Sequence, residues 1–231
     1  MRLKTNEVHV WQAVLGSEIS PWDLEDLLSD DEISRANRFH FEKDRKQFVV
    51  SRGILRTLLG NYLDCQPNKL SLLYSPYGKP FIENNEGLRF NLAHSQDVAV
   101  FGFSIKREIG IDVEQIRQIS DMEVLAARFF CQEETAKLMR LLPSERYCAF
   151  FRCWTRKEAY IKAIGKGLGI DLDQFEVSFC PGEPAALLKS LPGFADAWLW
   201  HLQEIPVESG YVGAVAAEGL EWNLTCFDWT R

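Results

Sequence analysis

The sequence lacks an excess of basic residues, and this excludes one large class of partner. Its 26 Lys and Arg face 33 Asp and Glu, which leaves a formal net charge of −7. Proteins that bind nucleic acid in general need a basic footprint to neutralise the phosphates. General nucleic-acid binding is therefore excluded, and any positively charged site has to be local.

Paired cysteines and long apolar runs are also missing. The six cysteines form no C-x-x-C pair and do not cluster with histidine, which argues against a disulfide framework or a zinc site. The first residues contain no apolar signal core, and the longest apolar stretch, near residues 98–105, is too short to span a membrane. We therefore expect a soluble, cytoplasmic protein with reduced cysteines and no membrane partner.

The pattern of apolar residues predicts an α+β fold, because helices and strands are grouped rather than strictly alternating. Four helix starts or spans stand out: after Ser20-Pro21, after the Ser29-x-x-Glu32 capping box, over 44–63, and over about 121–141. A further helix over 144–164 would be capped by Ser144 and ended by Gly165. Strands are expected at 7–14, 70–75, 88–93, 98–105, around 110–114, and near 175–179, 197–204, 211–217 and 222–228.

A charged turn at residues 106–109 is the only plausible seam in the chain. It divides the sequence into an N-terminal half, 1–108, and a C-terminal half, 109–231. The order of elements begins again after this turn, so we expect two intimately packed halves rather than separate domains.

Three acidic residues are the best candidates for chemistry. Asp112 and Glu114 stand two apart on a predicted strand, so both face one side, while the apolar residues that alternate with them, Ile109, Ile111 and Val113, face the other. Glu158 follows 44 residues after Glu114, on a predicted helix where Lys162 shares its face. Mg2+ uses such carboxylates together with phosphate oxygens of a substrate. The plainer alternatives are solvated acids and a surface ion pair.

Basic residues at two places suggest where phosphates would bind. Arg45, Arg52 and Arg56 form a stripe along the 44–63 helix, although such stripes more often simply face water. Lys157, Lys162 and Lys166 lie beside Gly165-Lys166-Gly167-Leu168-Gly169, a loop that lacks the spacing of a P-loop. His94, Ser95 and the turn Gly78-Lys79-Pro80 could surround a phosphate without a nucleophilic role.

Taken in order, these motifs resemble the Sfp-type 4'-phosphopantetheinyl transferases over about residues 29–179. The motifs are Tyr-Gly-Lys-Pro (77–80), Phe-Asn-Leu-Ala-His-Ser (90–95), Gly-Ile-Asp-Val-Glu (110–114), Arg-Phe-Phe (128–130) and Trp-Thr-Arg-Lys-Glu-Ala-Tyr-Ile-Lys-Ala-Ile-Gly-Lys-Gly (154–167). The resemblance implies two pseudo-twofold-related α+β halves with coenzyme A and Mg2+ in the cleft between them. It also implies a monomer, because one chain supplies both sides of the cleft.

The implied reaction is attack of a carrier-protein serine on the β-phosphate of coenzyme A, with release of adenosine 3',5'-bisphosphate. By resemblance, Asp112, Glu114 and Glu158 hold Mg2+, and Lys162 neutralises the pyrophosphate. Glu158 or a metal-bound water is the base. Coenzyme A would contact a further set of residues, namely Arg35, Arg45, Arg52, Lys79, Pro80, His94, Ser95, Lys157 and Lys162.

Two positions depart from the family pattern, and two other functions remain open. Ala93 replaces a serine found before the histidine in many relatives, and Glu32 replaces a lysine found in some, leaving Arg35 to bind. The alternatives are a metal-dependent phosphohydrolase that cleaves coenzyme A or a nucleotide with water, and a non-catalytic scaffold that binds carrier proteins. The natural carrier, whether of fatty-acid, polyketide or nonribosomal peptide synthesis, is not specified by the sequence.

Overall fold

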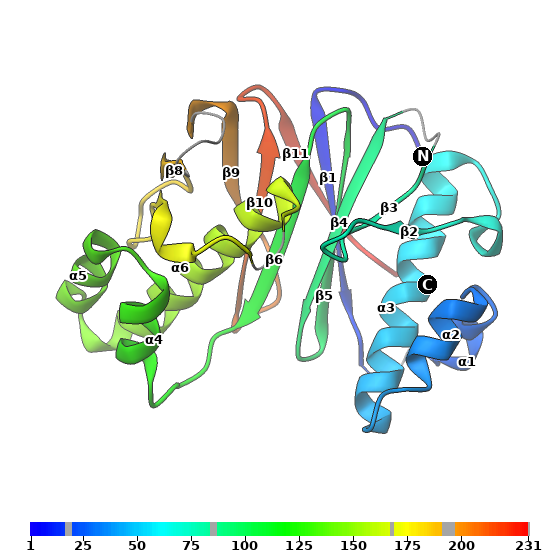
Figure 1. Ribbon diagram of the computed structural model, residues 1–231, viewed down its shortest axis with the longest axis horizontal. Coiled ribbons are helices and arrows are strands. Elements are labelled where there is room, and N and C mark those ends of the chain that lie inside the picture. Colours follow the sequence, from blue (N-terminus) through cyan, green and yellow to red (C-terminus); the bar gives the residue numbers. More distant parts are fainter. Residues whose placement is uncertain (17–19, 84–86, 167–168, 191–196, 231) are drawn as a thin grey trace.

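The computed structural model describes residues 1–16, 20–83, 87–166, 169–190 and 197–230. Two sheets stand back to back at the centre, and a long helix covers the outer face of each (Figure 1). The α-helices in the described residues are α1 (Trp22–Glu25), α2 (Asp30–Ala36), α3 (Glu42–Leu63), α4 (Met122–Phe129), α5 (Gln132–Arg140) and α6 (Pro143–Ile164). The strands are β1 (Glu7–Val14), β2 (Leu73–Tyr74), β3 (Pro80–Phe81), β4 (Leu88–Ser95), β5 (Val98–Ile105), β6 (Ile109–Gln115), β7 (Glu176–Val177), β8 (Leu187–Lys189), β9 (Trp200–Ile205), β10 (Tyr211–Glu218) and β11 (Asn223–Asp228).

In the first half, α3 packs on a four-stranded sheet of order β11-β1-β5-β4. The apolar residues at helical spacing in α3, including Ile54, Leu55 and Leu59, are fully buried against Phe101 and Phe103 of β5. The helix predicted over 44–63 is therefore confirmed, and its hydrophobic stripe is what holds it to the sheet. The capping box at Ser29 is confirmed as well, because Ser29 N donates to the Glu32 carboxylate at 3.1 Å.

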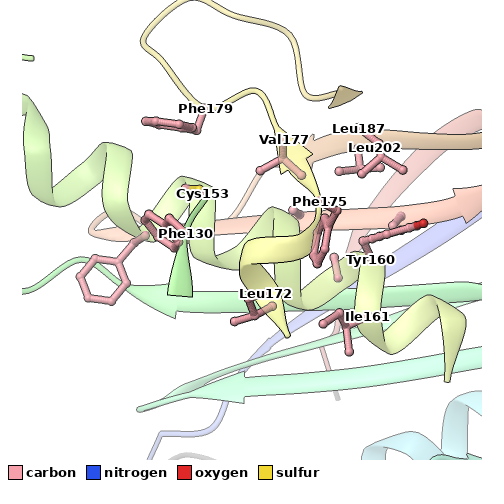
Figure 2. Packing of buried hydrophobic residues seen from close by; sticks show 14 of the residues in the cluster. Phe130, Cys153, Tyr160, Ile161, Leu172, Phe175, Val177, Phe179, Leu187 and Leu202 are labelled. Atoms are coloured by element: carbon pink, nitrogen blue, oxygen red, sulfur yellow. The ribbon is translucent and has the colours of Figure 1, made fainter. Parts of the chain in front are cut away.

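The second half repeats this arrangement with α6 on the three-stranded sheet β6-β10-β9. Its core contains Tyr160 of α6 against Phe175, with ring centres 5.0 Å apart, and Figure 2 shows these rings packed within one cluster. Gly165 ends α6 with φ of 74°, as predicted. Ser144 does not cap the helix, because Pro143 already occupies its first turn and Leu142 is the N-cap residue.

The inner faces of the two sheets meet in a third core. Val8 of β1 and Val100 of β5 pack in the same cluster as Ile111 and Val113 of β6 and Val215 of β10. This contact joins the halves into one body, and the α+β class and the pairing of two halves are confirmed. The boundary at residue 109 does not hold for β11, which returns from the second half and pairs in parallel with β1 of the first sheet.

Several elements differ from the sequence prediction in length. The helix expected over 121–141 is two helices, α4 and α5, because the chain breaks at Cys131, whose sulfur caps α5 by accepting from Glu134 N at 3.4 Å. The strand expected at 70–75 is reduced to Leu73–Tyr74, which pairs only with the short β3. Among the described residues, no helix is both long and apolar enough to cross a bilayer.

Gly110 allows α6 to lie unusually close to β6. A Cβ at this position would collide with the backbone oxygen of Ala159 and the backbone nitrogen of Ala163. The next residue with the same orientation on β6 is Asp112, so the close approach brings the α6 side chains directly over the acidic face of the strand. A single glycine thus sets the spacing of the two elements that carry the candidate site.

We predict that Gly110→Ala destabilises the protein by at least about 2 kcal/mol, because backbone rather than a flexible side chain stands in the way. Urea denaturation followed by circular dichroism measures this loss. Gly16→Ala is the matched control, since a Cβ there meets only Val14 Cγ1 at 3.9 Å. Equal stability of the two variants would show that α6 can move away from β6 at little cost.

Candidate functional site

A cleft of 360 Å3 lies between the two halves. The first half contributes α2, α3, β4 and the turn before β3, and the second half contributes the C-terminal end of α6. Its lining residues are Arg35, Phe48, Ser51, Arg52, Tyr74, Tyr77, Gly78, Lys79, Pro80, Asn91, Leu92, His94, Glu158, Ile161, Lys162 and Gly165. Sequence-predicted candidates from both halves therefore meet in one place.

Two arginines are gathered on one phenyl ring at the first-half end of the cleft. The guanidinium carbons of Arg35 and Arg52 lie 5.3 Å and 5.5 Å from the ring centre of Phe48. Arg52 is 6% exposed, and its buried Nη1 nitrogen has no hydrogen-bond partner among the described residues. Because a buried, unpaired donor is costly, this nitrogen is suited to bind an anion that enters the cleft.

Glu32 contacts two arginines of the stripe, Arg52 and Arg56, of which only Arg52 lines the cleft. Its Oε2 accepts from Arg56 Nε at 2.6 Å, and its Oε1 lies 3.3 Å from Arg52 Nε. Arg56 is completely buried and also donates to the carbonyl oxygens of Pro67 and Leu70, so it is structural. Glu32 thus positions the Arg52 guanidinium through an ion pair, and Glu32 itself does not line the cleft.

Arg45 does not belong to the cleft, which corrects the sequence prediction. Its Nη2 donates to Glu25 Oε1 at 2.7 Å, and it ties the start of α3 to α1. Arg45 stands seven residues before Arg52 on α3, yet only Arg52 reaches the cleft. Helical spacing placed both residues on one face but did not show that Arg45 is already paired.

Lys79, Pro80 and His94 line the middle of the cleft, as predicted. The Lys79 ammonium, however, donates to Glu108 and to the carbonyl oxygens of Ile109 and Ala163 at 3.0–3.2 Å, so it links β6 to the last turn of α6. Burial lowers the pKa of Lys79, and the Glu108 charge opposes this effect. Burial, joined by the charge of Lys162, also lowers the pKa of His94.

Asp112 lies under α6 in the most buried part of the site. It is 5% exposed, its Oδ1 accepts from Lys162 Nζ at 2.6 Å, and its Oδ2 is buried with no hydrogen-bond partner among the described residues. Burial raises the pKa of Asp112 to about 7, against the opposing effect of Lys162, and the charges of Glu158 and Glu114 add to the rise. Burial lowers the pKa of Lys162, but Asp112 and Glu158 raise it further than burial lowers it.

Glu114 is held by Ser95 of the first half and by Arg117, which follows the end of β6. Its Oε2 accepts from Ser95 Oγ at 2.8 Å and from Arg117 Nη1 at 3.4 Å. Ser95 was predicted to contact coenzyme A, but its side chain points toward β6 and is absent from the cleft lining. Strand periodicity accounts for the error, because Ser95 and His94 face opposite sides of β4.

Glu158 lines the cleft one turn before Lys162 on α6. Burial raises its pKa, while Lys162 lowers it and Glu114 raises it. As their side chains stand, no three acidic, histidine or cysteine residues in the described part of the chain are grouped as a metal site. The predicted trio is thus close enough to interact by charge, but the expected gathering of its oxygens at one point is not seen.

Lys157 was predicted to face a phosphate and instead lies in the core of the second half. It is 0% exposed, and its Nζ lies 2.7 Å from Glu134 Oε2. It also donates to the carbonyl oxygens of Leu172 and Phe175, at 2.8 Å and 2.6 Å. On a helix, Lys157 and Glu158 are about 100° apart, so the glutamate faces the cleft and the lysine faces away. Gly167 and Leu168 of the glycine-rich loop lie outside the described residues.

Aromatic residues of the cleft were not singled out from the sequence. Tyr74 and Tyr77 flank the predicted turn and line the cleft, and Tyr77 is 61% exposed. Tyr74 also lies beside Arg52, with 6.0 Å from the guanidinium carbon to the ring centre. The signal was present in Tyr74-Ser75-Pro76-Tyr77, where two tyrosines beside a tight turn offer flat surfaces for a ligand ring.

The arrangement is a cleft between two lobes, with the arginine pair at one end and Glu158 and Lys162 at the other, a distribution of charge that suits a phosphorylated ligand. Comparison with known proteins identifies the family. The model of the 4'-phosphopantetheinyl transferase superfamily matches residues 108–216, and that of the 4'-phosphopantetheinyl transferase N-terminal region matches residues 20–104.

Three curated relatives carry the same name. The 4'-phosphopantetheinyl transferase HetI of Nostoc sp. is 42% identical over 96% of this chain and 92% of its own length. A putative 4'-phosphopantetheinyl transferase of Synechocystis sp., slr0495, is 36% identical over 78% of this chain and 73% of its own. The transferase Sfp of Bacillus subtilis is 29% identical over 65% and 66%. The chain belongs to the 4'-phosphopantetheinyl transferase family, and the enzyme class predicted from its motifs is confirmed.

We predict that Lys157→Met lowers the free energy of unfolding by about 3–5 kcal/mol, because it leaves Glu134 buried without its cation. Coenzyme A affinity per folded molecule should change less than about twofold, since Lys157 does not reach the cleft. Denaturation and isothermal titration calorimetry measure the two quantities.

Glu134→Gln is the matched control for this prediction. It should cost a similar amount, and the double variant should cost less than the sum, because both changes break one pair. Loss of coenzyme A binding by Lys157→Met at unchanged stability would show that the lysine acts on the ligand after all.

Proposed function

We propose that this protein transfers the 4'-phosphopantetheine group of coenzyme A to a serine of an apo acyl or peptidyl carrier protein, and that it requires Mg2+. The products would be the holo carrier protein and adenosine 3',5'-bisphosphate. One observation carries the proposal: the arginine pair on Phe48 lines the same cleft as Glu158 and Lys162 of α6, and Lys162 contacts Asp112 of β6. A ligand with a phosphate at one end and a pyrophosphate further along fits this distribution of charge.

At the nucleotide end, Arg52, Arg35 and His94 are proposed to bind the 3'-phosphate. Arg52 supplies a buried donor that no described residue satisfies, and Arg35 lies against the same phenyl ring. Such charge-assisted hydrogen bonds are stronger than neutral ones. Pro80 and the stem of Lys79 would lie along the nucleotide, while the Lys79 ammonium keeps the two halves together.

At the pyrophosphate end, Asp112, Glu114 and Glu158 are proposed to hold Mg2+. The fit rests on the donor set, which is all carboxylate oxygen as Mg2+ prefers, and on the buried Oδ2 of Asp112, which no described residue satisfies. The ion would supply Lewis-acid neutralisation of the pyrophosphate charge. The Lys162 ammonium, 2.6 Å from Asp112, is placed to bind a phosphate oxygen as well.

Glu158 is proposed as the base that takes the serine proton, directly or through water. It lines the cleft on the same face of α6 as Lys162, where a carboxylate can accept a proton from a group bound beside it. The proton moves from the serine Oγ to the carboxylate while Oγ forms its bond to the β-phosphorus and the bond to the adenosine-bearing phosphate breaks. Lys162 neutralises charge on the departing group.

We further propose that the protein acts as a monomer in the cytoplasm. One chain provides both walls of the cleft, so a second copy is not needed to complete it. All six cysteines are free thiols, which suits a reducing compartment.

The decisive assay incubates the protein with coenzyme A, Mg2+ and an apo carrier protein and weighs the carrier by mass spectrometry. The proposal predicts a gain of one phosphopantetheine per carrier, abolished by EDTA and restored by added Mg2+. Consumption of coenzyme A without any carrier would favour the phosphohydrolase, and carrier binding without a mass gain would favour the scaffold. Asp112→Asn and Glu158→Gln should each lower the transfer rate by at least about 100-fold.

We predict that Arg52→Met raises the KM for coenzyme A by about 10- to 100-fold, the loss of a charge-assisted hydrogen bond. The KM for dephospho-coenzyme A, which lacks the 3'-phosphate, should barely change. Arg45→Met is the matched control on the same helix, since Arg45 is paired with Glu25 outside the cleft. An equal rise for both substrates would place the 3'-phosphate elsewhere.

A further inference from the structure

Two side chains of β4 complete the hydrogen bonding of β6 across the junction of the two sheets. β4 and β6 belong to different sheets, and β6 pairs with β10 on its other side. Asn91 Oδ1 accepts from Ile111 N at 3.0 Å, and Ser95 Oγ accepts from Gln115 N at 3.2 Å. The spacing of four residues is the same on both strands, so the strands run in one direction. Asp112 and Glu114 lie between the two points of attachment.

The Ser95 hydroxyl makes hydrogen bonds to two consecutive residues of β6, Glu114 and Gln115. Because the Gln115 amide can only donate, the hydroxyl hydrogen has to go to its second neighbour, the Glu114 carboxylate, at 2.8 Å. Ser95 is 8% exposed, so water does not readily replace it. Both hydrogen bonds that Glu114 accepts in the described part of the chain, from Ser95 and Arg117, go to Oε2. Oε1 is therefore the oxygen presented to a cation.

We propose that Ser95 is a positioning residue for the carboxylate of Glu114, and that through it the nucleotide-binding half of the protein sets the cation affinity of the other half. The inference rests on the proposed function and concerns a residue that touches neither cation nor coenzyme A. His94, its neighbour on β4, lines the nucleotide cleft on the opposite face of the strand. Strand β4 thus carries His94 on the face toward the nucleotide cleft and Ser95 on the face toward the proposed cation site.

The geometry gives Ser95 an effect on cation affinity that packing alone would not give. Hydrogen-bond partners of ligating carboxylates fix the ligand's orientation, and their loss typically weakens metal binding by roughly 10- to 100-fold. Without the hydroxyl, Glu114 would have to be reoriented when the cation binds. The Gln115 amide would also lose its acceptor at the junction.

The test measures Mn2+ binding to the full protein by electron paramagnetic resonance of the free ion, with no coenzyme A present. Ser95→Ala is expected to raise the Kd for Mn2+ by about 10- to 100-fold. Ser95→Thr, which keeps the hydroxyl, should recover most of the affinity. Binding of adenosine 3',5'-bisphosphate in EDTA, followed by calorimetry, should stay within about twofold because the arginine subsite is intact.

Ser104→Ala is the matched control, since Ser104 is a fully buried serine of the same sheet whose hydroxyl donates to Arg107 O, away from the acids. It should leave the Kd for Mn2+ unchanged. Wild-type Mn2+ binding with an unaltered Kd in Ser95→Ala would overturn this inference and leave the proposed function standing. Absence of Mn2+ binding by the wild-type protein would overturn the proposed cation site together with it.

Discussion

The site depends on the close approach of α6 to β6 that Gly110 permits. This contact places Lys162 over Asp112 and removes the aspartate from water, which accounts for the raised pKa of its carboxyl group. The ion pair at 2.6 Å between Lys162 and Asp112 forms across this contact. The position of these charges therefore depends on how closely the backbones of α6 and β6 pack, as well as on which side chains the two elements carry.

Much of the architecture could be predicted from the sequence, because periodicity and capping report directly on local structure. The stripe of α3, the capping box at Ser29 and the C-terminal glycine of α6 were all recognisable, and so was the acidic face of β6. What could not be predicted was the return of β11 to the first sheet, since pairing of strands more than 200 residues apart leaves no local pattern. The shared core between the sheets is invisible for the same reason.

Candidate site residues divide according to the partners they find. Arg52, His94 and Glu158 were predicted as site residues and line the cleft. Arg45 and Lys157 were predicted as well, but they form ion pairs with Glu25 and Glu134 away from it. A motif fixes residue type and spacing, but it does not reveal which charges are neutralised within the fold. Buried cations such as Lys157 are supported by acids far away in the sequence, and only the tertiary structure shows the pairing.

The path of β11 has a mechanical consequence. The chain passes between the lobes twice, once at residues 106–109 and again between β10 and β11. The two crossings lie side by side, because Arg107 Nη1 donates to Glu218 O at 2.7 Å and Glu218 N donates to Glu108 O at 3.1 Å. Rotation of one lobe about these adjacent crossings would have to separate the apolar cluster shared by the two sheets, and the loss of that buried contact opposes hinge bending. We therefore expect ligand entry to depend on side chains and short loops at the rim of the cleft more than on movement of one lobe against the other.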